Sequence, residues 1–127
     1  IFNKKKHTIK LHFDMFHGYG ILDKAIDLLN KNDRENFREY VNKNLFFNPH
    51  NMFIAHTKIM DEWFQSVFDW LFKCEEKFGF NSFLGYEKRF YGYLAERYLS
   101  YWFNKYTNPI EWDWVFVDMN NGKRTNV

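Results

Sequence analysis

The chain has 127 residues, 46% of them hydrophobic and 23% aromatic, which is enough for one domain with a well-filled core. Its 18 basic and 16 acidic residues give a net charge of +2 without a basic stripe, so we expect no nucleic-acid partner. The single cysteine, Cys74, excludes an internal disulfide and fits a reducing compartment, and no apolar run approaches the roughly 18 residues of a membrane span.

Three short helices are predicted in the first third of the chain. Thr8 can cap a first, irregular helix, which ends at Gly18. The apolar spacing over residues 21–31 predicts an amphipathic helix, and Asp33 is a suitable N-cap for a third helix over residues 34–43.

A strand and a long helix are predicted next. Residues 48–51 have the composition of a turn, and the apolar run 52–55 predicts a short buried strand. Thr57 can cap a long helix over residues 58–78, which Gly79 ends. The apolar positions of this helix are Met60, Trp63, Phe64, Val67, Phe68, Leu71, Cys74 and Phe78.

The last third contains one more helix and one more strand. A helix over residues 89–106 is stopped by Asn-Pro at its end, and the alternation over residues 112–117 predicts a strand. Residues 119–127 are predicted to be a polar tail that contains an Asn-Gly turn signal. We therefore expect a helix-dominated α/β fold, with residues 1–118 as a single domain.

The helix over residues 89–106 is apolar on nearly every side, yet it carries Glu96 and Arg97 at its middle. An unpaired buried carboxylate is costly, so Glu96 needs either a structural partner or a chemical role, and on the helix alone the structural partner is favoured. An ion pair between Glu96 and Arg97 is not expected, because adjacent helix positions do not face each other. Arg89 lies about two turns away, roughly 10 Å along the axis.

Polar residues gather at the entrance of the predicted strand. Asn48, His50 and Asn51 would lie at one edge of the sheet, where ligands collect in open α/β folds, or the two asparagines would simply shape the turn. The histidines at positions 7, 12 and 17 are spaced by five, which does not stack them on one helix face. We therefore predict no metal site in this chain.

Three segments resemble the C-terminal half of the DUF4422 family: NMFIA at 51–55, FDWLF at 68–72 and RFYGYLAER at 89–97. That family is glycosyltransferase-like and occurs in bacterial capsular and surface-polysaccharide gene clusters. The family's N-terminal half, with a His-Tyr-Arg-Arg-Tyr run, and an Asp-x-Asp motif are both missing here. The chain also begins with Ile1 rather than Met, so we expect the acceptor-side part of a larger glycosyltransferase domain with a GT-A-like fold.

The resemblance implies roles for individual residues. Glu96 would be the catalytic base, and Arg97 and Arg89 would orient it or bind phosphate oxygens. Asn51 would bind a sugar hydroxyl or hold the cleft loop. No cofactor is expected in this chain, and a divalent Mn or Mg ion would be held by the missing half. The residues expected to bind substrate are Asn48, Asn51, Arg89, Arg97 and His17.

The implied enzyme transfers a sugar from a nucleotide-sugar donor to a growing capsular or lipopolysaccharide glycan. It would act in the cytoplasm, or at the inner face of the cell membrane as a peripheral protein, and this chain alone would be inactive. The alternative is a non-catalytic helical interaction module or glycan-binding module, whose aromatic surface binds a partner. A strand-rich half encoded upstream of Ile1 would favour the enzyme, and a start codon there would favour the module.

Overall fold

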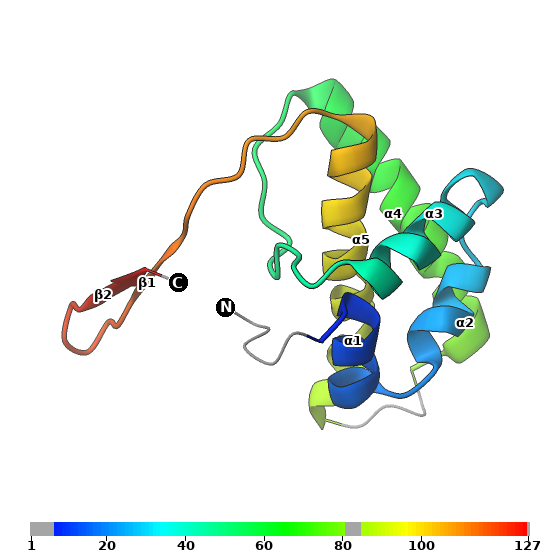
Figure 1. Cartoon of the computed structure of the whole chain (residues 1–127), viewed down its shortest axis with the longest axis horizontal. Helices are drawn as coiled ribbons and strands as arrows, with labels where there is room; N and C mark the ends of the chain where they lie inside the picture. The colour runs from blue at the N-terminus through cyan, green and yellow to red at the C-terminus, as the bar shows by residue number, and fades with distance from the viewer. Residues whose placement is uncertain (1–6, 81–84, 127) are drawn as a thin grey trace.

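The computed structural model describes residues 7–80 and 85–126, and within them the fold is mainly helical. Five α-helices and one short 3₁₀ helix precede a two-stranded antiparallel sheet (Figure 1). The elements are α1 (Ile9–His17), α2 (Ile21–Asp27), α3 (Lys31–Lys43), α4 (Thr57–Phe78), η1 (Gly85–Arg89), α5 (Phe90–Tyr106), β1 (Val115–Val117) and β2 (Arg124–Asn126).

The first three helices are present, but α2 ends at Asp27 rather than at residue 31, and α3 begins at Lys31 rather than at residue 34. The Thr8 hydroxyl accepts a hydrogen bond from the Leu11 backbone N–H at 3.2 Å, which confirms Thr8 as the N-cap of α1. The predicted cap of the third helix is wrong. Asn30 caps α3 by accepting from the Asp33 backbone N–H at 3.1 Å, so Asp33 lies within the first turn.

Helix α5 forms the centre of the helical body (Figure 1), with α1, α3 and α4 packed around it. Ten of its residues are buried, on almost every side of the helix. This agrees with the all-round apolar sequence of the segment, since only a helix surrounded by other elements can bury so much of its circumference.

Helix α4 begins at Thr57, one residue before the predicted start, and Gly79 ends it with a φ of 64° as predicted. Thr57 is inside the helix rather than capping it, because His56 occupies the N-cap position. The buried stripe is narrower than the predicted apolar face and includes a residue that the prediction omitted. The buried residues of α4 are Trp63, Val67, Trp70 and Cys74.

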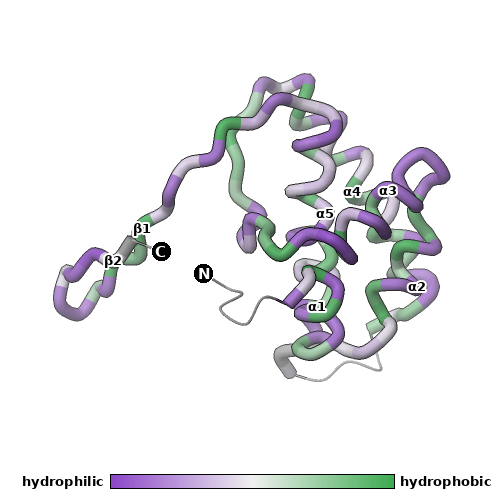
Figure 2. The backbone as a smooth tube through the Cα atoms, in the orientation of Figure 1, coloured by the Kyte–Doolittle hydropathy of each residue, from purple (hydrophilic) through white to green (hydrophobic). Residues whose placement is uncertain are grey.

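The predicted buried strand over residues 52–55 is wrong. This segment is outside any sheet, and Met52 and Ile54 are 70% and 95% exposed. Figure 2 shows it as a hydrophobic stretch that leads into α4. Among the described residues no strand lies beside it to complete a ladder of backbone hydrogen bonds. It is held instead through Phe53, whose ring lies 4.9 Å from that of Phe103 on α5.

The sheet of the described structure is a hairpin after α5. Val115–Val117 pairs with Arg124–Asn126, so the predicted strand is shorter than expected, and the segment predicted as a polar tail contributes the second strand. Gly122 has a φ of 67° and its N–H donates to the Asp118 carbonyl at 2.8 Å, which confirms the turn signal. In Figure 1 the hairpin stands away from the helices, with β1 exposed along its length.

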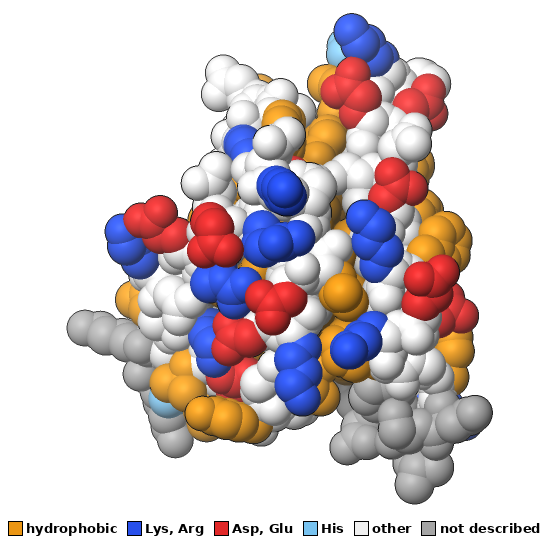
Figure 3. Space-filling model, turned by 90° about the vertical axis from the view of Figure 1, so that its right-hand side faces the viewer, with side chains coloured by type: hydrophobic (Ala, Val, Ile, Leu, Met, Phe, Trp, Pro, Cys, Tyr) orange, Lys and Arg blue, Asp and Glu red, His pale blue; other side chains and the backbone are white. Residues whose placement is uncertain are grey.

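A network of ion pairs joins α1, α2 and α3 at the surface. Lys10 lies 2.6 Å from Asp14 and 3.1 Å from Asp23, and Arg38 lies 3.3 Å from Asp23 and 2.6 Å from Asp27. Figure 3 shows basic and acidic side chains intermixed on this side of the molecule. The charges here therefore hold three short helices together.

Candidate functional site

Glu96 lies on α5 as a half-buried carboxylate, with its side chain 20% exposed. Burial raises its pKa above the usual value, and the nearby charges of Arg97, His50 and Arg89 act in the opposite direction. Its Oε2 accepts a hydrogen bond from Arg97 Nη1 at 3.2 Å. Glu96 therefore has both the accessibility of a reactive group and a fixed cationic partner.

The ion pair between Glu96 and Arg97 corrects the sequence-based expectation. Helical side chains lean toward the N-terminus, so Arg97 extends back along α5, where its Nη1 also donates to the Tyr93 carbonyl at 3.3 Å. This bend brings the guanidinium beside Glu96, although the two residues are adjacent in sequence. The side chains of Glu96 and Arg97 are long enough to form a hydrogen bond even though their Cβ atoms point in different directions from the helix axis.

Arg97 itself is almost completely buried, with 2% of its side chain exposed. Its guanidinium carbon lies 5.3 Å from the centre of the Phe13 ring and 4.5 Å from that of Phe47. Its Nη2 is 3.2 Å from Nδ1 of His12, while its Nε is buried without a hydrogen-bond partner among the described residues. Burial lowers the pKa of Arg97 to about 10, with Glu96 opposing the shift.

Two histidines flank this arginine. The rings of His12 and His17 lie 6.4 Å apart, and His17 stacks on Tyr93 at 4.0 Å. Burial lowers the pKa of His17 to about 4, and Arg97 and His12 add to the shift. Burial and Arg97 also lower the pKa of His12. Both rings are therefore neutral at pH 7, which leaves Nδ1 of His12 able to accept from Arg97.

The predicted substrate residues Asn51 and Arg89 lie near the first turns of α5. Nδ2 of Asn51 donates to the Gly92 carbonyl at 3.4 Å, so the turn at residues 48–51 is attached one helical turn before Glu96. The guanidinium of Arg89 lies 6.0 Å from the centre of the Tyr93 ring. Both side chains belong to exposed residues, and the charge of Arg89 lowers the pKa of Glu96.

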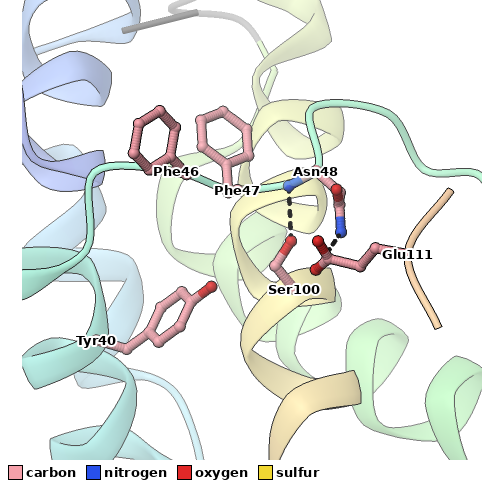
Figure 4. Close-up of a pocket in the computed structure, with 6 residues that line it drawn as sticks. All are labelled: Tyr40, Phe46, Phe47, Asn48, Ser100 and Glu111. Atoms are coloured by element: carbon pink, nitrogen blue, oxygen red, sulfur yellow. Dashed lines mark hydrogen bonds between the residues drawn. The ribbon is translucent and has the colours of Figure 1, made fainter. Parts of the chain in front are cut away.

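Asn48 belongs to a small pocket one turn further along α5 (Figure 4). Its backbone N–H donates to Ser100 Oγ at 2.8 Å, and its Nδ2 donates to Glu111 Oε1 at 3.3 Å. The cavity volume is about 90 Å³. Of these groups the sequence indicated only Asn48. The residues lining the pocket are Tyr40, Phe46, Phe47, Asn48, Ser100 and Glu111.

A second buried carboxylate, Asp33, is part of the frame that holds α5. Its Oδ1 accepts from the Tyr101 hydroxyl at 2.9 Å, the Tyr106 hydroxyl at 2.8 Å and Lys105 Nζ at 2.8 Å, and its Oδ2 accepts from Asn30 Nδ2 at 3.0 Å. Burial opposes ionisation, but these four hydrogen bonds outweigh it and lower the pKa of Asp33. With its acceptors occupied, Asp33 ties the start of α3 to the end of α5.

Two kinds of feature are absent from the part of the chain that the structure describes. Within residues 7–80 and 85–126, no three His, Cys, Asp or Glu side chains come together in a way that could hold a metal ion. Over the same ranges, no helix is both long and apolar enough to cross a membrane.

Comparison with known proteins identifies one family. Neither the curated proteins nor the solved structures include a match to this sequence. The family DUF4422, described as a domain of unknown function, matches residues 1–108. This range contains all six residues that the sequence singled out as candidate site residues. Because the match covers most of its length, the chain belongs to the DUF4422 family.

Proposed function

We propose that this chain is the acceptor-side part of a glycosyltransferase with a GT-A-like fold, which transfers a sugar from a nucleotide-sugar donor to a capsular or lipopolysaccharide glycan. The observation that carries the proposal is Glu96, a half-buried carboxylate on the central helix that a buried arginine holds in place. The proposal places the protein in the cytoplasm or peripherally at the inner face of the membrane, where nucleotide sugars are available.

In the proposed reaction Glu96 accepts the proton of an acceptor hydroxyl as that oxygen forms a bond to the anomeric carbon of the donor. The bond between the anomeric carbon and the phosphate oxygen breaks, and the nucleoside diphosphate leaves with the electron pair. A divalent metal ion held outside this chain would stabilise the negative charge of that leaving group. The pKa of Glu96, raised by burial, suits a base that must hold the proton after transfer.

The buried position of Arg97 changes its proposed role from phosphate binding to positioning. Its guanidinium is enclosed by Phe13, Phe47 and His12, so a diphosphate has little access to it. The same contacts fix the Nη1 that binds Glu96. Arg89, which is exposed and near Tyr93, is the better candidate of the two arginines for a substrate phosphate.

Replacing Glu96→Gln in the full-length protein that contains this chain tests the proposal. The amide keeps an acceptor for Arg97 but cannot take a proton, so we expect transfer to fall by about 10²–10⁴-fold while the protein still folds. Glu76→Gln, an exposed carboxylate change on α4, is the matched control and should keep full activity. Retained transfer in Glu96→Gln would remove Glu96 as the base. A large loss of thermal stability in this variant would support a structural role instead.

A non-catalytic interaction module is the second candidate, because α4 carries an exposed aromatic stripe. Phe64, Phe68 and Phe72 are 39%, 47% and 60% exposed, and successive rings lie 6.1 and 6.0 Å apart. Exposed aromatic patches of this kind are typical of protein interfaces. If the chain is an interaction module, Phe68→Ser should abolish the biological activity of the protein and Glu96→Gln should leave it unchanged. If the chain is part of an enzyme, Glu96→Gln should abolish that activity.

A further inference from the structure

The pocket beside Ser100 brings polar groups from four separate segments to one place. Tyr40 comes from α3, Asn48 from the turn after it, Ser100 from α5 and Glu111 from the segment before β1 (Figure 4). Burial and the charge of Glu111 raise the pKa of Tyr40. Asn48 joins the other two groups, because its backbone N–H donates to Ser100 Oγ at 2.8 Å and its Nδ2 donates to Glu111 Oε1 at 3.3 Å. The pocket is therefore a hydrogen-bonded cluster that already has a fixed geometry.

The chemistry of the lining points to a neutral, hydroxyl-bearing ligand. The two hydroxyls and the amide can donate to or accept from the hydroxyl groups of a sugar, and the carboxylate can accept from them. The six lining residues include a carboxylate but no Lys or Arg, so a phosphate or a sugar acid would meet a like charge without a cation to offset it. A nucleoside diphosphate is therefore disfavoured.

The size and place of the pocket restrict the ligand further. A cavity of about 90 Å³ is well below the roughly 300–1,000 Å³ of sites that enclose a whole drug-sized ligand, so it fits the hydroxyl-bearing edge of one sugar ring rather than a whole ring. The exposed ring of Phe46 at the pocket can pack against the apolar face of that sugar. Ser100 follows Glu96 by one helical turn, about 6 Å along the axis of α5.

We propose that this pocket binds a neutral sugar unit of the acceptor glycan, next to the hydroxyl that Glu96 would deprotonate. The inference rests on the proposed function for its place in the reaction, but the binding itself does not require catalysis. Glu111 lies beyond residue 108, where the match to the family ends. The carboxylate contribution is therefore assigned to this chain and not to the family as a whole.

The test measures sugar binding to the full chain by NMR titration with the methyl glycosides of neutral hexoses. We expect saturable shifts at the pocket, and Glu111→Ala should weaken binding by about tenfold, because a hydrogen bond to a charged acceptor is lost. Asp113→Ala is the matched control, since this exposed carboxylate two positions away does not line the pocket. Its affinity should equal that of the unchanged chain.

A second pair of variants guards against a local change of structure at Glu111. Tyr40→Phe removes only a hydroxyl and should weaken binding several-fold, whereas Tyr19→Phe, on an exposed ring outside the pocket, should have no effect. The inference is overturned if no neutral hexoside binds, if Glu111→Ala and Tyr40→Phe both bind normally, or if uridine diphosphate shifts the pocket residues.

The two proposals fail separately. Hexoside binding is measured without a donor, so retained transfer in Glu96→Gln would refute the proposed base and leave the binding result in place. Loss of transfer in Glu96→Gln, together with no hexoside binding, would refute only the proposed sugar binding at the pocket.

Discussion

Removing the carboxylate of Asp33 should destabilise the protein strongly, because this buried group holds several partners. Replacing Asp33→Ala leaves the hydroxyls of Tyr101 and Tyr106 without their acceptor and removes the partner of Lys105. Breaking a buried ion pair from one side costs about 3–5 kcal/mol. Lys105 is 28% exposed and can turn to water, so we expect the lower end, about 3 kcal/mol.

Urea denaturation followed by far-UV circular dichroism measures this loss, with Asp113→Ala as the exposed control. The pH dependence gives an independent check. Because the pKa of Asp33 is lowered in the folded state, its stabilisation is complete above the unfolded pKa, near 4, and is lost as the pH falls toward the folded value. The difference in the free energy of unfolding between the unchanged chain and the variant should therefore become smaller as the pH falls. A loss below about 1 kcal/mol at pH 7, or a difference that grows in acid, would refute the reasoning.

Three further predictions concern the helical frame. Trp70→Phe should lower the free energy of unfolding in urea by about 2 kcal/mol, because the buried indole N–H donates to the Ala25 carbonyl at 2.7 Å. An unchanged free energy of unfolding would contradict this bond. Gly18→Ala should cost more than 1 kcal/mol, since φ is 123° and the new Cβ would lie 2.5 Å from Ile21 Cδ1; an unchanged melting temperature would contradict the strain. Cys74 should react with a thiol reagent only after denaturation, because burial raises its pKa to about 12; rapid labelling of the folded protein would contradict it.

The helices could be predicted from the sequence because their periodicity and caps are local features. The absence of a strand at residues 52–55 could not be predicted, since an apolar run of four residues has no period of its own and becomes a strand only beside another strand. Trp70, in contrast, was predictable as a core residue, because it follows Val67 by three positions and precedes Cys74 by four, which places all three on one helix face. Only its partner, the Ala25 carbonyl on α2, is not encoded in the pattern of α4.

The candidate site was predictable in part. Glu96 was identified because a carboxylate in an apolar helix is unusual, and the structure gives it a partner that the rule for adjacent positions excluded. His12 and Phe47, which enclose Arg97, were not identified, because their proximity depends on how α1 and the segment after α3 pack on α5. The contact of Glu111 with Asn48 was not predicted for the same reason, since the two residues lie 63 positions apart.

One face of α5 explains why this buried helix carries polar residues. Gly92, Glu96 and Ser100 are spaced by four and share a face. The non-helical segment that contains Asn48 and Asn51 contacts both ends of this face, and a non-helical backbone needs hydrogen-bond partners that an apolar helix face does not offer. The Gly92 carbonyl and the Ser100 hydroxyl supply them. Glu96 makes no bond to this segment among the described hydrogen bonds, and Arg97 holds its carboxylate between the two anchoring contacts.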